Sequence, residues 1–169
     1  GTLDYIPNTD ALRIILSEII PRLSKSNLNY RIIICGNRIA EKWQQVLVAE
    51  PKIIFEGFVT DIAPYFKGAD CFINPITLGS GLKTKLVEAL ANNLNIISTV
   101  SGAKGIDLMY TNEKLTVIKD YDWDAFAQAM ITFDMINEKE TPTIFYNDLN
   151  WNSIIAKAIL SLAQLPKQA

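Results

Sequence analysis

A chain of 169 residues, 49% hydrophobic and 20% charged, lies in the ordinary globular range and is long enough to bury one core. The net charge of -2 excludes the basic excess that a general nucleic-acid surface requires, and no apolar run approaches the roughly 18 residues of a membrane-spanning helix. We therefore expect a single domain over residues 1–169, with no nucleic-acid partner and no transmembrane segment.

Residue usage also limits the chemistry that this chain can perform. Histidine is absent, which removes the commonest general base and metal ligand. No cluster of metal-ligating residues is visible in the sequence, so no metal site is expected. Two cysteines, Cys35 and Cys71, lie in apolar strand-like runs, where a thiol behaves as a small buried hydrophobe. We expect both to be reduced core residues of a cytoplasmic protein.

The first half of the chain alternates helical and strand patterns. Apolar residues recur at helical spacing from Asp10 to Ser24, after the potential caps Asn8 and Thr9, and Pro21 predicts a late kink. The short apolar run YRIIIC is typical of a strand buried on both faces. The further predicted elements are a helix at 39–49, a strand at 52–56 closed by Gly57, and a short helix at 60–66 that Thr60 or Asp61 can cap.

The second half continues the alternation. The predicted elements are strands at 71–74, 96–100 and 115–119, helices at 82–92, 123–136 and 151–165, a loop with Gly102 and Gly105, a cap at Asp122, and a polar link with Pro142 and Asn147. Strands that alternate with helices in this way form parallel sheets. The fold class that we predict is α/β, a Rossmann-like three-layer α/β/α domain with a mostly parallel sheet.

The stretch from Asp70 to Ile106 carries the strongest chemical signal. Its turn, residues 78–82, joins a buried strand to a helix, and the glycines Gly79 and Gly81 allow the backbone to approach a ligand. The first amides of a helix lack intrahelical partners and carry the positive end of the helix dipole, so they favour phosphate. Lys83 and Lys85 add positive charge at this point. The pattern predicts a site for a diphosphate.

Glu88 follows on the same helix, where a carboxylate can accept hydrogen bonds from the paired hydroxyls of a sugar. Plainer explanations stay open: the glycines can be turn residues only, the lysines can form a solvated face, and Glu88 can pair with Lys85. The segment GSGLKT lacks the spacing of a P-loop, and no GxGxxG follows any strand. Kinase-like and dehydrogenase-like functions therefore lose most of their support.

The run NPITLGSGLKTKLVEALANNLNIISTVSGAKGI resembles the donor-binding C-terminal domain of the group 1 (family 4) glycosyltransferases, which have two Rossmann-like domains facing a cleft. Nearly the whole chain shares the resemblance. The segments concerned are GTLDYIPN after the family's first strand, YRIIICGN and IIFEGFVTDIAPYFKGADCFINP around the cleft, and the closing helix with Trp151. The resemblance implies the C-terminal half of a longer two-domain enzyme, whose acceptor-binding N-terminal domain is missing here.

The resemblance also implies a donor substrate, a nucleoside-diphosphate sugar, and no cofactor. Glu88 would bind the ribose, the loop at 78–82 would offer amides to the sugar and diphosphate, and Lys83 would neutralise phosphate. Phe58 and Val59 would border the base. The substrate-binding residues expected in total are Phe58, Val59, Gly79, Ser80, Gly81, Leu82, Lys83, Lys85 and Glu88.

Three departures from the family pattern bear on activity. Ser80 stands where many members carry a second glutamate, although a glycine-loop variant with basic residues at the positions of Lys83 and Lys85 exists. Asn93 replaces a common glycine, and TLDYIPN lacks the family's arginine and lysine. No catalytic residue is assigned, and the isolated domain is expected to be inactive without its acceptor-binding half.

The expected function is transfer of a sugar to an acceptor hydroxyl, with a saccharide or lipid-linked acceptor, in glycan or polysaccharide synthesis. Relatives with lipid-linked acceptors are often peripheral at the inner face of the membrane. The alternatives are a non-catalytic nucleotide-binding or assembly module of the same fold, and a nucleotide-sugar epimerase domain.

Overall fold

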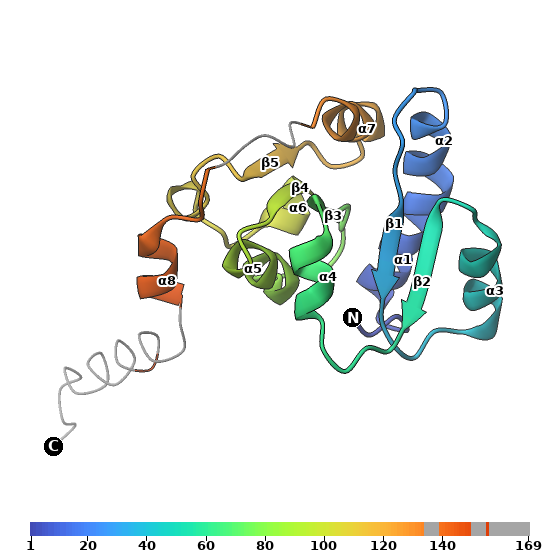
Figure 1. Ribbon diagram of the computed structural model, residues 1–169, viewed down its shortest axis with the longest axis horizontal. Coiled ribbons are helices and arrows are strands. Elements are labelled where there is room, and N and C mark those ends of the chain that lie inside the picture. The colour runs from blue at the N-terminus through green and yellow to red at the C-terminus, as the bar shows by residue number, and fades with distance from the viewer. Residues whose placement is uncertain (134–138, 150–154, 156–169) are drawn as a thin grey trace, which may run out of the picture.

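The computed structural model describes residues 1–133, 139–149 and 155, and its strands form two parallel sheets (Figure 1). Helices flank both sheets, which confirms the Rossmann-like α/β fold class. All three strand pairings are parallel, but the strands do not form one continuous sheet. The first sheet has the order β1-β2, with β1 (Ile32–Cys35) and β2 (Ile53–Gly57), and the second has the order β3-β4-β5, with β3 (Cys71–Asn74), β4 (Asn95–Thr99) and β5 (Leu115–Ile118).

The chain opens with one helical run, made of α1 (Ile6–Ile14), η1 (Ile15–Ile19) and α2 (Ile20–Leu23). The predicted caps were wrong. The run begins at Ile6 with Pro7 in its first turn, while the Thr9 hydroxyl donates to the Leu3 carbonyl at 2.7 Å. The irregularity expected near Pro21 is present as the π-helical turn η1, because a proline has no N–H for the regular hydrogen bond.

Four predicted helices are found within a few residues of their expected bounds. One of them has its predicted aspartate cap, since Asp122 Oδ1 accepts from the Ala125 amide at 3.0 Å. The cap predicted for the helix at 60–66 was wrong: Ile62 is its N-cap, without a side-chain cap, and Asp61, one residue earlier, accepts from the Ala63 amide at 2.9 Å. These helices are α3 (Glu41–Ala49), α4 (Ala63–Gly68), α5 (Thr84–Ala91) and α7 (Trp123–Ile131).

Three further helical segments lie where the sequence predicted loops or a polar link. They are α6 (Val100–Ala103), η2 (Leu108–Tyr110) and α8 (Thr143–Leu149). α8 corrects the link prediction: it follows Pro142 and buries Phe145 beside α5 and β4, so burial outweighs the polar character of its segment. The helix predicted at 151–165 lies outside the described residues.

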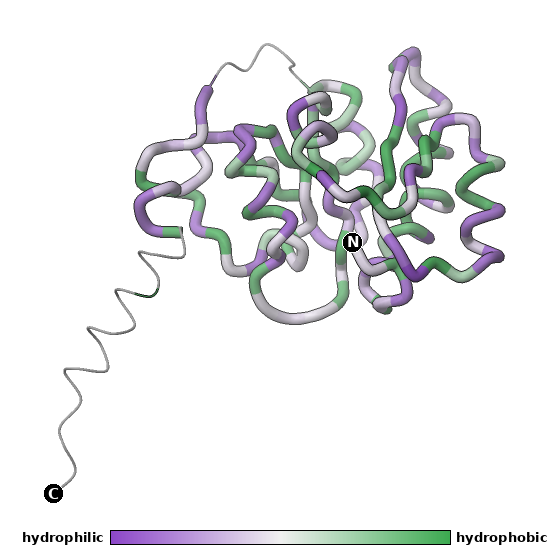
Figure 2. Tube along the Cα trace, turned by 60° about the horizontal axis from the view of Figure 1, so that its bottom comes forward, coloured by the Kyte–Doolittle hydropathy of each residue, from purple (hydrophilic) through white to green (hydrophobic). Residues whose placement is uncertain are grey.

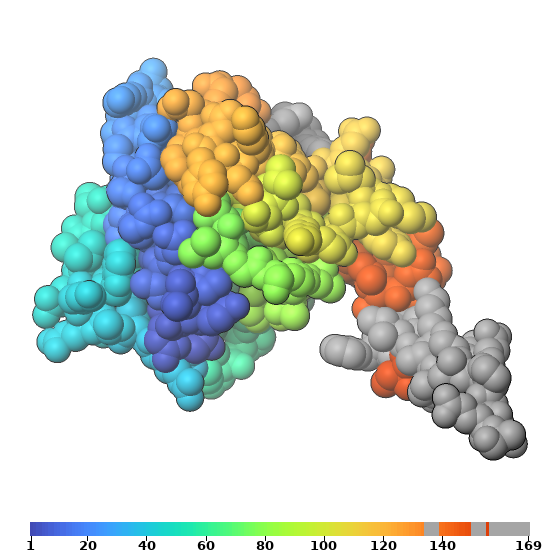
Figure 3. Space-filling view, turned by 180° about the vertical axis from the view of Figure 1, so that it is seen from behind, coloured from blue at the N-terminus to red at the C-terminus, as the bar shows by residue number. Residues whose placement is uncertain are grey.

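The two sheets share a hydrophobic core through helices. The first helical run packs against α7, and the space-filling view from behind shows them side by side (Figure 3). Ile19, Leu23 and Phe126 are fully buried at this contact. Along the chain, hydrophobic and hydrophilic residues alternate over the helices, as expected when one face of each lies on the core (Figure 2).

β1 is covered less completely than its sequence predicted. Ile32 and Ile34 are buried, but Ile33 is 44% exposed, so the expectation of burial on both faces was wrong for this strand. Ile54 of β2 is 39% exposed in the same way. Alternate side chains point to opposite faces of a strand, so one face of the first sheet is only partly covered.

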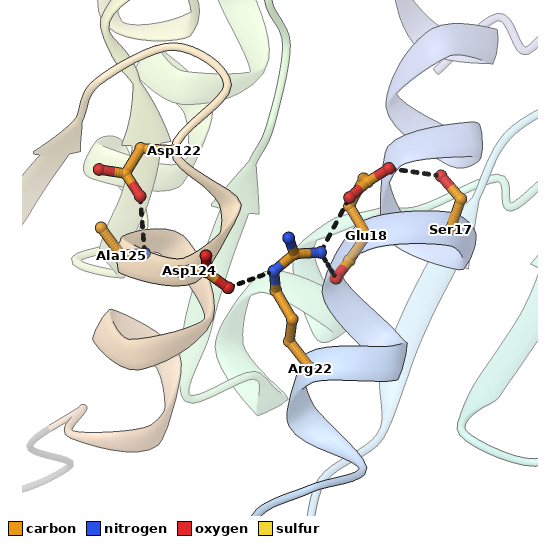
Figure 4. A network of polar contacts seen from close by, with 6 residues as sticks. All are labelled: Ser17, Glu18, Arg22, Asp122, Asp124 and Ala125. Carbon is orange, nitrogen blue, oxygen red and sulfur yellow. Dashed lines mark hydrogen bonds and ion pairs between the residues drawn. The ribbon is translucent and has the colours of Figure 1, made fainter.

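An ion-pair network joins the outer ends of α2 and α7 (Figure 4). Arg22 Nε lies 2.7 Å from Asp124 Oδ1, and Arg22 Nη1 donates to Glu18 Oε2 at 2.8 Å and to the Glu18 carbonyl at 2.9 Å. The carboxylates raise the pKa of Arg22, with Asp124 the main cause. Because Asp124 is 87% exposed, water screens the pair, and the apolar contact below it supplies most of the packing energy.

Replacement of the buried aromatic ring at this contact should therefore destabilise the whole fold. For Phe126→Ala we expect a loss of about 3–5 kcal/mol in the free energy of unfolding, measured by urea denaturation. Val48→Ala on α3, where the side chain is 67% exposed, is the control and should change it by less than about 0.5 kcal/mol. Equal effects of the two substitutions would contradict the assignment of this contact as the joint core.

Candidate donor-binding site

A buried polar network fixes the carboxyl end of β3. The Asn74 side chain is 4% exposed, and its Nδ2 donates to Ser98 Oγ at 3.0 Å and to the Gly102 carbonyl at 3.1 Å. Ser98, at the neighbouring position on β4, is fully buried. Buried amide groups are costly unless they are paired, so this network sets the position of the chain after β3 relative to α6.

The ends of β4 and β5 are joined to the same network. Thr99 Oγ1 donates to the Ile76 carbonyl and accepts from the Gly102 amide, which caps α6. Asp120, just after β5, accepts from the Ser101 amide at 2.9 Å and from its hydroxyl at 2.5 Å. No sequence pattern pointed to these bonds, because their partners lie far apart in the chain. Together with the bonds of Asn74, these hydrogen bonds connect the carboxyl ends of β3, β4 and β5 beside the loop that precedes α5.

The loop itself bends at its two glycines. Gly79 has φ 86° and Gly81 has φ 78°, backbone conformations that side chains rarely adopt. Lys83 Nζ reaches back to the Gly81 carbonyl at 3.2 Å and the Ser80 carbonyl at 3.4 Å. The lysine ammonium is thus held over the loop, in contact with carbonyl oxygens that a phosphate can replace as its partners.

α5 starts at Thr84, two residues later than predicted, with Lys83 in the N-cap position. No side chain caps this end, and the Lys83 carbonyl accepts from the amides of Leu86 and Val87. The amides of Thr84 and Lys85 lie before this first bond, so they belong to the N–H groups at the helix start that have no partner within the helix.

Glu88 pairs with Lys85 in the structure. Lys85 Nζ lies 2.7 Å from Glu88 Oε2 and 3.0 Å from Oε1, with the Glu88 side chain 40% exposed. The plainer explanation of Glu88 therefore describes a contact that is present. An exposed pair of this kind is weak, so it leaves the carboxylate able to exchange its partner for a sugar hydroxyl.

A cavity of about 1380 Å³ lies beside the loop and extends between the two sheets. Six of the nine expected residues line it, from two directions: Phe58 and Val59 after β2, and Ser80, Leu82, Lys83 and Lys85 around the start of α5. Gly79, Gly81 and Glu88 are not among its lining residues. Tyr5 and Asn37 also line it and were missed by sequence reasoning, although Asn37 follows the end of a parallel strand, where ligand sites form.

Within the described part of the chain, no three or more Cys, Asp or Glu side chains come together as a possible metal site. In the same residues, no helix has the length and apolar character needed to cross a membrane. Both cysteines are free, and burial raises the pKa of Cys71 to about 12. Cys71 thus stays a thiol at neutral pH, with little nucleophilic character.

The amino-acid sequence of this chain matches one known protein family. Residues 1–133 match the family described as Glycosyl transferases group 1. The chain belongs to this family. Its sequence-based resemblance to group 1 glycosyltransferases is therefore confirmed.

Three proteins similar to this group 1 chain are longer than the chain itself. It is 25% identical over 127 residues to an uncharacterized 44.6 kDa protein in the cps region of Klebsiella pneumoniae, covering 71% of the chain and 32% of that relative. A glycosyltransferase from Rickettsia africae has the same fold, with a TM-score of 0.71 and 13% identity over 94% of the chain and 46% of its own. Anabaena HepE, in complex with UDP, gives 0.60 and 15% over 87% and 44%. The chain thus spans less than half of each.

The polar network predicts an unusual sensitivity at Gly102. A Cβ there would lie 2.6 Å from both Asn74 Nδ2 and Ser98 Oγ, so Gly102→Ala should displace the network and lower the free energy of unfolding by about 1–3 kcal/mol. Gly68→Ala is the matched control, because a Cβ there has no neighbour within 4 Å. Calorimetric melting of both variants checks this, and a Gly102→Ala variant as stable as the control would contradict the role given to the network.

Proposed function

We propose that this chain is the nucleotide-sugar-binding domain of a glycosyltransferase, which transfers a sugar from a nucleoside-diphosphate sugar to an acceptor hydroxyl. The observation that carries the proposal is the loop before α5. It combines two glycines with positive φ, an uncapped helix start and the Lys83 ammonium, all beside one cavity. Backbone amides and a cation at one point form a site for phosphate oxygens.

The diphosphate would lie at the start of α5, where the amides of Thr84 and Lys85 and the Lys83 ammonium meet it. Such groups stabilise negative charge as it develops on the departing nucleoside diphosphate, which is the main barrier in sugar transfer. The polar network at the ends of β3 and β4 reaches this part of the chain just before the loop, at Ile76, whose carbonyl accepts from the Thr99 hydroxyl. The UDP complex of Anabaena HepE supports a nucleotide as the ligand class.

The nucleoside would extend from the diphosphate toward Phe58 and Val59. Phe58 is 70% exposed beside the cavity, and an exposed aromatic ring can stack on a base. Glu88 would release Lys85 and accept hydrogen bonds from the ribose hydroxyls. In the absence of nucleotide, Lys85 and Glu88 thus bind each other, and each exchanges its partner when the nucleotide binds.

A binding module without chemistry of its own is the second candidate, favoured by one observation. Among the described residues that line the cavity, the only carboxylate is that of Asp70, at the opposite end of β3 from the loop. Ser80 lies in the loop where a carboxylate would contact the sugar. This chain would then bind the donor, while a separate acceptor-binding domain supplies the remaining groups. An epimerase has no observation in its favour.

The wider setting of the proposal rests on the relatives. We place the activity in glycan or polysaccharide synthesis, with a saccharide or lipid-linked acceptor. The relative described as a protein in the cps region of Klebsiella pneumoniae supports this setting. The location proposed is cytoplasmic, with peripheral attachment to the inner face of the membrane when the acceptor is lipid-linked. No cofactor or metal is required by the groups named above.

Calorimetric titration of the chain with UDP, GDP and ADP tests the donor site. We expect one of them to bind, and Lys83→Ala to weaken that binding by about 10- to 100-fold, the usual contribution of a hydrogen bond to a charged group. Lys25→Ala, at an exposed position outside the cavity, is the control and should leave the affinity unchanged. A folded chain that binds none of the three nucleotides would refute the proposal.

The role of Glu88 is tested by removing either side of the contact. Glu88→Gln should weaken binding of the preferred ribonucleotide about tenfold and should leave the affinity for its 2′,3′-dideoxy analogue unchanged, because that analogue lacks both hydroxyls. Glu41→Gln on α3 is the control. If Glu88→Gln weakens both ligands equally, the carboxylate does not read the ribose hydroxyls.

A further inference from the structure

Tyr5 uses its backbone to start α1 and leaves its side chain in the cavity. It is the N-cap residue of α1, and its carbonyl accepts from the amides of Asn8 at 2.9 Å and Thr9 at 3.0 Å. Its side chain is 58% exposed and lines the cavity. None of the described residues accepts a hydrogen bond from the Tyr5 hydroxyl, so this donor is available to a ligand.

The Tyr5 hydroxyl and the Lys83 ammonium approach the same glycine from different elements. A Cβ placed on Gly79 would lie 3.6 Å from the Tyr5 hydroxyl oxygen and 3.7 Å from Lys83 Nζ. The same point is 3.4 Å from the Pro7 ring, so the start of α1 lies directly beside the loop before α5. The two segments also lie side by side in the space-filling view, the first in blue and the second in green (Figure 3).

Both of these groups are hydrogen-bond donors. The Lys83 ammonium has three N–H groups and donates to the carbonyls of Gly81 and Ser80, while the Tyr5 phenol has one O–H. Two donors that face one point are best satisfied by an acceptor between them. An anionic oxygen is the strongest acceptor, because hydrogen bonds to a charged partner are roughly twice as strong as those between neutral groups.

Among the described residues, no carboxylate takes up the Tyr5 hydroxyl. Of those that line the cavity, only Asp70 carries a carboxylate, and it lies at the far end of β3. Asp10, further along α1, is engaged with Arg13 Nη2 at 2.9 Å and with the Thr77 hydroxyl at 3.5 Å. The acceptor for the Tyr5 hydroxyl therefore comes from solvent in the free protein and from a ligand in a complex.

The backbone around Tyr5 is fixed before a ligand arrives. The Thr9 hydroxyl donates to the Leu3 carbonyl at 2.7 Å, which ties the residues before α1 to its first turn. The contact between Asp10 and Thr77 joins α1 to the chain just before the glycine loop. Only the side chain of Tyr5 has to be ordered on binding, so the entropic cost of the contact is small.

We propose that the Tyr5 hydroxyl donates to an oxygen of the phosphate group that Lys83 neutralises, so that the diphosphate is bound from α1 as well as from α5. The assignment rests on the donor site proposed above and adds a residue to it. Residues 1–9 contain no arginine or lysine, so the α1 side of the site contributes a neutral donor while the positive charge comes from the α5 side. The hydroxyl recognises the phosphate group and not the base or the ribose.

Titration calorimetry with Tyr5→Phe tests the assignment, because this substitution removes the hydroxyl and keeps the ring. The probes are whichever of UDP, GDP and ADP binds most tightly, the nucleoside of the same base, and inorganic pyrophosphate. We expect Tyr5→Phe to weaken nucleotide and pyrophosphate binding about tenfold, and to leave nucleoside binding and the melting temperature unchanged. Tyr121→Phe, at a position that is 67% exposed and does not line the cavity, is the matched control and should leave all three affinities unchanged.

Three results would overturn the assignment. Full nucleotide affinity in Tyr5→Phe, while Lys83→Ala binds weakly, would reject Tyr5 and leave the donor site in place. Equal losses of nucleotide and nucleoside binding in Tyr5→Phe would show that the hydroxyl contacts the nucleoside instead of the phosphate. If the folded, unmodified chain binds neither the nucleotides nor pyrophosphate, the donor site itself is refuted, and the assignment of Tyr5 with it.

Discussion

The amide side chain of Asn74 is the contact on which the site depends. It lies buried where β3 ends and donates to groups on β4 and α6, so the loop above it has a fixed base. Removing water from such a group is costly unless both of its hydrogens are used, and the fold uses both. The chain is thus anchored just before the glycine loop begins, where the Ile76 carbonyl accepts from the Thr99 hydroxyl.

The start of α5 brings positive charge next to the loop. α5 begins without a side-chain cap, and a lysine occupies the N-cap position, where a helix gains nothing from a positive charge. Lys83 donates to loop carbonyls and Lys85 pairs with Glu88, so each cation has a neighbouring partner that binds it only weakly. This arrangement is poor for the helix alone and favourable for an anion with several oxygens.

Sequence patterns predicted the parallel α/β architecture because strand and helix periodicities are local. They also predicted the aspartate cap at Asp122, which acts over three residues. They missed α8 and the Asn74 network, since both depend on partners far away in the chain: Phe145 packs in the cluster around α5, and Asn74 meets Gly102. The burial predicted for Ile33 also failed, because it depends on what covers the strand rather than on the strand itself.

The arrangement of the core has a consequence for the order of folding. Each described strand pairs with a neighbour about 20 residues away, so each sheet forms by closing short loops, which is fast. The contact between α2 and α7 joins residues 102 positions apart, as in Arg22 and Asp124. We expect the two sheets to form early as separate units and α7 to dock late, so that the rate-limiting barrier lies at the joint between the halves.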